Sequence, residues 1–173
     1  MKPVLPSLLA ILFVISGCTT MSAAEKEQKR RALDIMAGGT ITRLLVQYRE
    51  LESEIENAPG YIVAHINAPA ANGGEGVLVV SGSGERRYFT IGKVEVGSGW
   101  GTRSFKILLV LNTQEMLDRF KNGTQGSQTA TTSEKAPSRN NEYMVYIMSD
   151  SGVAVTAAVK IIDFSVNHKL TTM

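Results

Sequence analysis

The chain has 173 residues, of which 43% are hydrophobic and 20% are charged. This composition is sufficient to bury a core and excludes disordered, collagen-like and small disulfide-stapled proteins. With 18 basic and 16 acidic residues, the formal net charge of +2 is too small for the broad positive field of a protein that binds duplex DNA. One cysteine, Cys18, and two histidines, His65 and His168, are too few for a structural zinc site. We therefore expect no nucleic acid, metal or cofactor.

The first 17 residues are typical of a secretory signal peptide, with Lys2 ahead of an apolar stretch of about twelve residues. A helix of that length rises about 18 Å, which is short of the roughly 30 Å hydrocarbon layer of a bilayer. Ile15-Ser16-Gly17-Cys18 resembles the lipobox of bacterial lipoproteins. The resemblance implies cleavage before Cys18, a diacylglyceryl thioether on its sulfur and an acyl group on its new amine. The alternative is an ordinary cleavable signal with an incidental cysteine.

The residue after the cysteine predicts the final location. Lipoproteins kept at the inner membrane usually carry aspartate at this position, whereas this chain has Thr19. The resemblance therefore implies that the protein is held by its lipids at the periplasmic face of the outer membrane.

Two helices are predicted next. Ser22 and Glu25 have the spacing of a capping box, so a helix is expected to begin there and to end at Gly38-Gly39, where glycine can adopt the left-handed conformation. Thr40 is the expected N-cap of a second helix. Its apolar residues recur at spacings of three and four and predict a stripe that faces the core: Ile41, Leu44, Leu45, Tyr48, Leu51 and Ile55. Its opposite flank is expected to be solvated: Glu50, Glu52, Glu54 and Glu56.

Beyond residue 60 the pattern changes to that of short antiparallel strands separated by glycine-containing turns. The predicted strands cover residues 61–66, 76–81, 87–91, 93–96, 105–111, 143–148, 153–159 and 160–166. Residues 105–111 are apolar on both faces, which is typical of a central strand. Asn112 is the expected cap of a short helix through Phe120. Residues 123–141 contain no aromatic or branched aliphatic side chain, so we predict a mobile loop.

These elements predict an α+β fold: an N-terminal helix pair packed on a strongly coiled, mostly antiparallel, glycine-rich sheet of about six to seven strands, with one short helix inserted. The predicted organisation is a cleaved signal peptide at 1–17, a lipidated tether at 18–22, a single domain at 23–167 and a tail at 168–173.

Nine of the 16 glycines lie between residues 73 and 101. A phosphate-binding loop would need a strand, the glycines and then a helix, but here strands follow the glycines. Glycines within strands instead indicate bulges, bends or close approach of two backbones, as in a strongly coiled sheet.

The order of four segments resembles that of the SYLF domain, over roughly residues 30 to 166. The segments are Ala58-Pro59-Gly60-Tyr61-Ile62-Val63, Gly73-Gly74-Glu75-Gly76-Val77-Leu78, Gly97-Ser98-Gly99-Trp100-Gly101 and the run from Leu109 to Phe120. The resemblance implies a lipid-binding module, and it makes Gly73, Gly74, Gly76, Gly97, Gly99 and Gly101 family-motif glycines. In some relatives, affinity for anionic lipid is attributed to a basic N-terminal helix. The matching basic residues here are Lys26, Lys29, Arg30 and Arg31.

No catalytic constellation is visible in the sequence. His65 lies in a predicted apolar strand and His168 in a polar tail, while Ser83 and Ser98 lack the Gly-x-Ser-x-Gly spacing of a nucleophile elbow. The first hypothesis is therefore a non-enzymatic lipoprotein whose SYLF-like domain binds phospholipid. The alternative is a structural or adaptor lipoprotein that binds another protein of the cell envelope through Trp100 and the predicted loop. An alternative role for the four bases is a solvated helix face balanced by Glu25, Glu27 and Asp34.

Overall fold

The computed structural model describes residues 21–67, 73–96, 104–123, 128–131, 138–139, 142–152 and 158–171. The predicted signal peptide, the lipidation site Cys18 and the motif glycines Gly97, Gly99 and Gly101 lie outside these ranges.

The fold is α+β, as predicted, and the sheet is antiparallel and open, with the strand order β5-β8-β3-β2-β1-β4-β7-β6. Six strands have seven residues or more, and the two edge strands β5 and β6 have four and two. The elements are α1 (Ala23–Gln47), α2 (Leu51–Asn57), β1 (Gly60–Ile66), β2 (Gly74–Val80), β3 (Arg86–Val96), β4 (Phe105–Leu111), α3 (Gln114–Lys121), β5 (Gln128–Thr131), β6 (Ser138–Arg139), β7 (Tyr143–Ser149), β8 (Ala158–Val166) and α4 (His168–Thr171).

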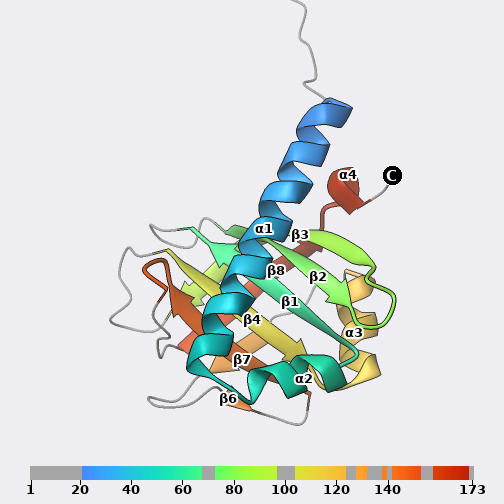
Figure 1. Cartoon of the computed structure of the whole chain (residues 1–173). Helices are drawn as coiled ribbons and strands as arrows, with labels where there is room; N and C mark the ends of the chain where they lie inside the picture. Colours follow the sequence, from blue (N-terminus) through green and yellow to red (C-terminus); the bar gives the residue numbers. More distant parts are fainter. Residues whose placement is uncertain are drawn as a thin grey trace, which may run out of the picture.

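The central strand prediction is confirmed for β4. It pairs with β1 on one side and β7 on the other, and every residue except Lys106 is buried. Because its side chains are apolar on both faces, each face of the sheet must be covered. α1 covers one face, and α3 covers part of the other (Figure 1).

The helix that covers the first face starts as predicted. The Ser22 hydroxyl accepts from the Glu25 amide at 3.2 Å, and the Glu25 carboxylate accepts from the Ser22 amide at 2.7 Å, which completes a capping box. Leu33 is the first apolar residue of α1 to be buried on the sheet. The turns before it project beyond the sheet in Figure 1. We call residues 23–36 the arm.

The prediction that the first helix ends at Gly38-Gly39 is wrong, since α1 continues for 25 residues. Ala37, Thr40 and Leu44 are at most 5% exposed and pack toward the sheet on one side of the helix. Their burial outweighs the cost of about 1 kcal/mol for each glycine within a helix.

The second predicted helix is correspondingly shorter. The chain leaves the helix at Tyr48, which has an extended backbone, and the seven-residue α2 follows after a turn. The predicted pair of helices packed on the sheet is thus replaced by one long helix and one short one. The apolar stripe is nevertheless confirmed, because Leu44 and Leu51 are buried and the others pack against the same cluster: Ile41, Leu45, Tyr48 and Ile55.

The second face of the sheet holds the larger apolar cluster. The ring of Phe164 lies 4.2 Å from that of Phe89 and 5.0 Å from that of Phe120, measured between centroids. Phe120 belongs to α3, whose N-cap is Thr113, with its hydroxyl accepting from the Met116 amide. The predicted N-cap, Asn112, is one residue before the observed one. The backbone amide of Asn112 instead donates to the Glu142 carbonyl.

Close approach of neighbouring backbones explains the glycines at the start of β2. A Cβ on Gly73, whose φ is +83°, would collide with the Ile91 carbonyl, and one on Gly74 would collide with the His65 carbonyl. A Cβ on Gly76 would lie 2.6 Å from the Val63 carbonyl oxygen. Of the three roles expected for glycines in strands, which were bulges, bends and close approach of two backbones, these motif glycines serve the last.

Four further predictions need correction. The strands expected at 87–91 and 93–96 are one strand, β3, with irregular register beside Gly92. The predicted loop at 123–141 contains the edge strands β5 and β6, which pair with β8 and β7.

The C-terminal part of the chain also differs from the prediction. Of the expected strands 153–159 and 160–166, residues 158–166 form the single strand β8, and residues 153–157 lie outside the described ranges. The predicted tail contains α4, whose Leu170 is 1% exposed because it completes the core beneath α1.

Two alanine substitutions should move stability in opposite directions. We expect Gly76→Ala to destabilise the domain by about 1–3 kcal/mol, because β1 must shift to admit the methyl group. Gly38→Ala should stabilise it by about 0.5–1 kcal/mol, since the added Cβ has nothing within 4 Å and the helix loses a glycine. Urea unfolding followed by circular dichroism measures both effects. A Gly76→Ala variant as stable as the wild type would contradict the close-contact explanation.

Candidate functional site

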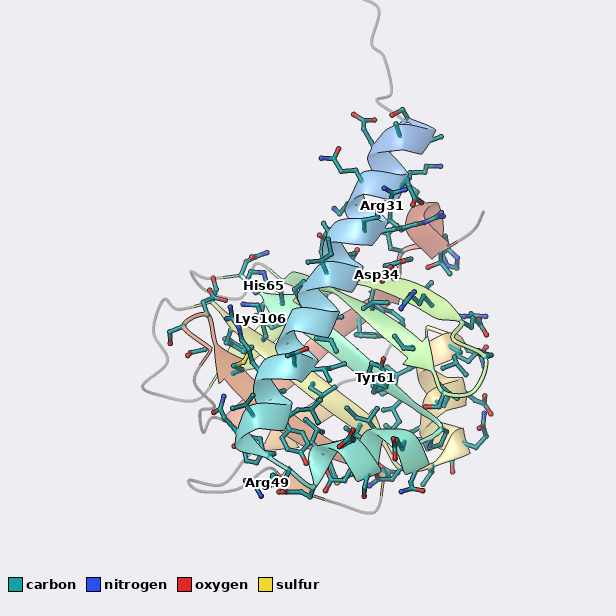
Figure 2. All side chains as sticks on the ribbon, in the orientation of Figure 1. Arg31, Asp34, Arg49, Tyr61, His65 and Lys106 are labelled. Atoms are coloured by element: carbon teal, nitrogen blue, oxygen red, sulfur yellow. The ribbon has the colours of Figure 1, made fainter. Side chains whose placement is uncertain are left out.

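The four bases predicted to bind lipid all lie on the arm, but they have different partners. Lys29 Nζ lies 2.5 Å from Glu75 Oε1 on β2, and Arg30 Nε donates to the Leu170 carbonyl at 2.6 Å. These two bases therefore hold α1 to the sheet and to α4. Arg31 pairs with Glu27 one turn away, at 2.9 Å, and its side chain is 74% exposed. Figure 2 shows Arg31 on the projecting arm, well away from the sheet.

Lys26, the fourth base, is half-buried near the start of the arm, with no ion pair among the described residues. Lys26 and Arg31 are thus the two bases that can meet a charged surface without releasing α1 from the body of the domain. The arm has little apolar surface to insert into a membrane, since Ile35 is the one large apolar side chain there that is strongly exposed.

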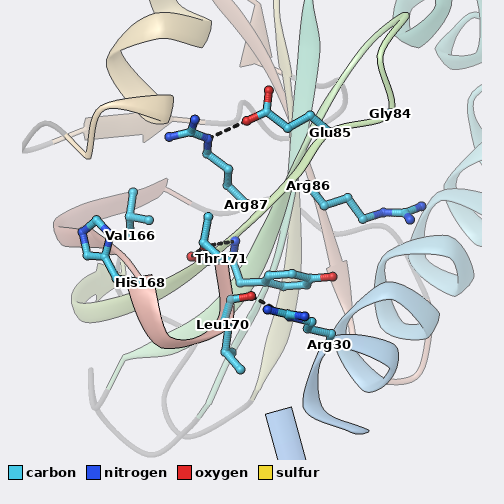
Figure 3. Close-up of a pocket in the computed structure, with 10 residues that line it drawn as sticks. Arg30, Gly84, Glu85, Arg86, Arg87, Val166, His168, Leu170 and Thr171 are labelled. Carbon is cyan, nitrogen blue, oxygen red and sulfur yellow. Dashed lines mark hydrogen bonds and ion pairs between the residues drawn. The ribbon is translucent and has the colours of Figure 1, made fainter. Parts of the chain in front are cut away.

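A groove of about 570 Å³ lies between α1, β3 and α4 (Figure 3). It forms because β8 stops pairing at Val166, opposite Phe89, and leaves the first residues of β3 without a strand on that side. Asn167 and α4 occupy the position beside these residues of β3. The Asn167 backbone amide donates to the Tyr88 carbonyl at 2.8 Å, and the Tyr88 backbone amide donates to the Thr171 hydroxyl at 3.1 Å.

The groove lining is rich in positive charge. It contains three arginines and one carboxylate, together with a histidine and several apolar or neutral groups. The lining residues are Arg30, Gly84, Glu85, Arg86, Arg87, Tyr88, Val166, His168, Leu170 and Thr171. Consecutive residues of a strand point to opposite faces, so Arg86 extends toward α1 and Arg87 extends to the other side of the β3 edge (Figure 3).

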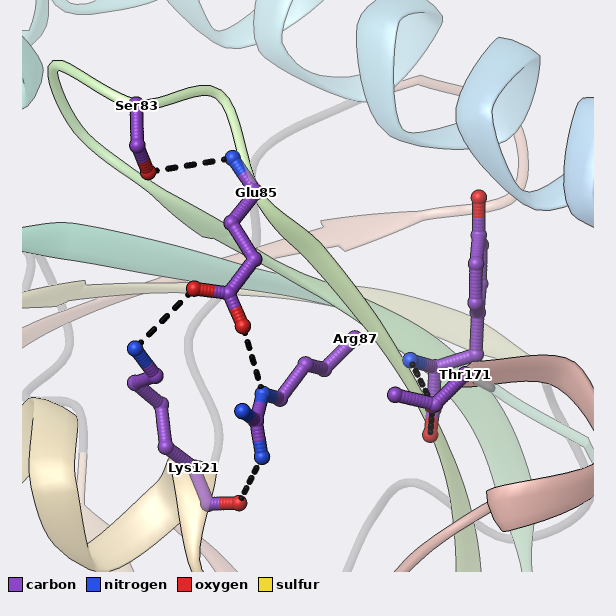
Figure 4. Close-up of polar contacts among 6 residues, drawn as sticks. Ser83, Glu85, Arg87, Lys121 and Thr171 are labelled. Carbon is purple, nitrogen blue, oxygen red and sulfur yellow. Dashed lines mark hydrogen bonds and ion pairs between the residues drawn. The ribbon is translucent and has the colours of Figure 1, made fainter. Parts of the chain in front are cut away.

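The one carboxylate of the groove is neutralised by two bases. Glu85 accepts from Arg87 Nε at 2.8 Å and from Lys121 Nζ at 3.0 Å, and Arg87 also donates to the Lys121 carbonyl at 2.7 Å (Figure 4). The hydrogen bond from Arg87, and then that from Lys121, lower the pKa of Glu85 below its ordinary value of 4.5. Glu85 is therefore ionised and paired at neutral pH.

A second polar contact joins the arm to β3. Burial, and next the charge of Asp34, raise the pKa of the Tyr88 hydroxyl, which therefore stays protonated and donates to Asp34 at 3.3 Å. Arg86 Nε lies 3.4 Å from the same carboxylate. Asp34 is thus balanced by β3 and is not an isolated charge on the arm.

His65 lies in a row of charged side chains at the far end of β1, where Glu75 and Lys106 are its cross-strand neighbours. Lys106 Nζ is 2.7 Å from Asp150 Oδ1, and His65 Nε2 is 3.3 Å from the same oxygen without hydrogen-bond geometry. Partial burial alone would raise the pKa of Asp150, but the hydrogen bond and charge of Lys106 outweigh it and lower that pKa. The row is a surface ion-pair network beside the core.

Charge is distributed unevenly along the helical layer. The arm and α4 together carry five basic and three acidic residues, whereas residues 49–57 carry Arg49 and four glutamates. Figures 1 and 2 place these two groups at opposite ends of the molecule. Three of the glutamates, Glu50, Glu52 and Glu56, are exposed as predicted, while Glu54 is half-buried and accepts from the Tyr146 hydroxyl.

Within the described ranges, no group of three or more His, Cys, Asp or Glu side chains is arranged to hold a metal ion. In the same part of the chain, no helix combines the length and apolar character needed to cross a membrane. His168 lies on α4, in the groove lining, and Ser83 lies in the β2–β3 turn, where its hydroxyl accepts from the Glu85 amide at 3.2 Å.

A scan of the chain against protein-family models finds no match, and no curated protein matches its sequence. The SYLF resemblance therefore remains a prediction.

The sequence did not predict the groove, because its residues come from three distant segments. The available signal was Glu85-Arg86-Arg87 after a turn, a run of charges at the start of a strand. That this run lies beside Arg30 and His168 could not be predicted, because it depends on where β8 ends and on how α4 packs.

Replacing Glu85 by glutamine should reveal its pairing through the pH dependence of stability. We expect Glu85→Gln to lower the free energy of unfolding at pH 7 by about 0.5 kcal/mol, a small effect because the carboxylate is 39% exposed and screened by water. A carboxyl whose pKa is lowered by folding stabilises above its unfolded pKa, and this contribution disappears as the pH falls through the folded value. The difference between variant and wild type should therefore vanish in acid. Glu52→Gln, at an exposed position on α2, is the control and should show no such change.

Proposed function

We propose that the protein is a non-enzymatic, lipid-anchored protein of the outer membrane whose domain associates with anionic phospholipid through the arm. The observation that carries the proposal is the coincidence of the basic end of the molecule with the end at which the tether enters. α1 begins at Ala23, five residues after Cys18 in the sequence, and its first turns form the arm.

Distance supports an electrostatic role for the arm. Lys26 and Arg31 are the fourth and ninth residues of α1, so they lie within about 13 Å of its start at 1.5 Å per residue. Attraction to an anionic surface contributes about 1 kcal/mol per base within a Debye length of about 8 Å. The glutamates of α2 lie at the far end of the molecule, where salt screens their repulsion from the anionic membrane.

The arm is suited to peripheral association. Its exposed residues are mostly polar or small, with Ile35 as the main apolar exception. Stable membrane anchoring needs more than one signal, and in this proposal the lipids on Cys18 supply the hydrophobic part while the arm supplies the charge. The adaptor alternative depends on Trp100 and on the predicted loop at 123–141; Trp100 and most of that loop lie outside the described residues.

Anchoring is tested by the mass and location of the native protein. We expect the mature chain to begin at Cys18 and to carry a mass increment matching diacylglyceryl and N-acyl groups. Cys18→Ser should remove the increment and release the protein from the membrane fraction, because each lost methylene contact contributes about 0.8 kcal/mol. A bare thiol, or an untrimmed leader on the native protein, would overturn lipidation.

Lipid association is tested with the soluble chain 19–173 and vesicles that contain phosphatidylglycerol. We expect sedimentation at low salt that is lost at high salt, and a double reversal, Lys26→Glu with Arg31→Glu, should lower the partition coefficient at least tenfold. These positions are preferred to Lys29 and Arg30, because the latter hold α1 in place.

The matched control is Arg43→Glu with Arg49→Glu, which changes the net charge equally at the other end of the helical layer. It should sediment like the wild type. Equal binding by the arm variant and the wild type would refute this role for the arm, as would equal losses in both double variants.

A further inference from the structure

The groove between α1, β3 and α4 has the chemistry of a site for an organic phosphate. We propose that it binds a phosphate ester, with the phosphate beside Arg87 and His168 and the organic part against Val166 and Thr171. The proposal rests on the proposed function and deepens it. The arm would meet the membrane surface as a whole, whereas the groove would recognise the head group of one lipid molecule.

The first observation is the number of donors left unused on two arginines that line the groove. Arg87 uses Nε toward Glu85 and Nη1 toward the Lys121 carbonyl, so the two donors on Nη2 are not used by any described residue. Arg86 contacts Asp34 through Nε, and its two terminal nitrogens have no partner in the described part of the chain. A guanidinium group with adjacent donors is well matched to the oxygens of a phosphate.

The second observation is that Glu85 leaves the groove positive. Its carboxylate is already bonded to Arg87 and Lys121, so it orients the Arg87 guanidinium and neutralises only part of the local charge. Arg30 and Arg86 add two further charges from the α1 side of the strand edge, and Asp34 balances that of Arg86. An anion entering the groove therefore meets a net positive field.

The third observation is the mixed character of the walls. Val166 is half-buried and packs against the second apolar cluster, so it offers rigid apolar surface next to the charges. Thr171 is oriented by its bonds with Tyr88. A volume of about 570 Å³ is in the range of small-molecule sites and suits a head group with its glycerol better than a bare ion.

The test uses the chain 19–173, which contains every described residue, and titrates it with dihexanoyl phosphatidylglycerol below its micelle concentration, with glycerol 3-phosphate and with acetate. Amide chemical shifts locate binding, and calorimetry measures the affinity. We expect saturable shifts at residues 84–88 and 166–171 with the two phosphate esters and none with acetate. Arg87→Gln should weaken binding at least tenfold.

Arg86→Gln and His168→Gln test the site independently, in case Arg87→Gln misfolds. Each should weaken binding severalfold while leaving the rest of the spectrum unchanged. Arg49→Gln, at the other end of the molecule, should bind like the wild type. Binding of the lipid analogue identifies a head group as the source of the phosphate, whereas binding of glycerol 3-phosphate alone identifies a soluble ester.

Shifts located elsewhere, or wild-type affinity in both arginine variants, would overturn the proposal. The two proposals fail separately. Vesicle sedimentation that persists without groove shifts refutes the groove site, and groove shifts without sedimentation refute the membrane role of the arm.

Discussion

The fold depends on a sheet that is apolar on both faces and must be covered on both. β4 buries six of its seven side chains, so neither face can meet water. α1 meets this requirement on one face through Leu33, Ala37 and Leu44, and each of the two leucines contributes about 1.5–3 kcal/mol on burial. This packing fixes the direction of the helix, and the turns before Leu33, which form most of the arm, must therefore extend past the sheet.

Local chemistry could be predicted from the sequence where neighbouring residues determine it. The capping box at Ser22 and Glu25, the apolar runs that form β1, β4 and β7, and the close-contact role of Gly73, Gly74 and Gly76 are of this kind. The errors arose where tertiary packing decides. Gly38-Gly39 would end an isolated helix, but Thr40 and Leu44 are buried just beyond it and carry the helix on. Residues 168–171 form too short a segment to predict a helix, and α4 is stabilised by its bonds to Tyr88 and by the burial of Leu170.

The candidate site shows the same division. The four bases of the arm could be named in advance, yet their roles could not be, because Glu75 and the Leu170 carbonyl come from distant parts of the chain. Lys29 and Arg30 stabilise the packing of α1, while Lys26 and Arg31 remain available for a surface. The groove could not be predicted, since it depends on β8 ending opposite Phe89, before it reaches the charged residues at the start of β3.

The bond from Arg30 to the Leu170 carbonyl also fixes α4 beside the arm, so α4 lies at the same end of the molecule as the start of α1 (Figure 1). In a chain held by N-terminal lipids, a fluorescent protein or affinity tag placed directly after α4 would be crowded against the bilayer. The solvated flank of α2, at the far end, is the better position for such a label.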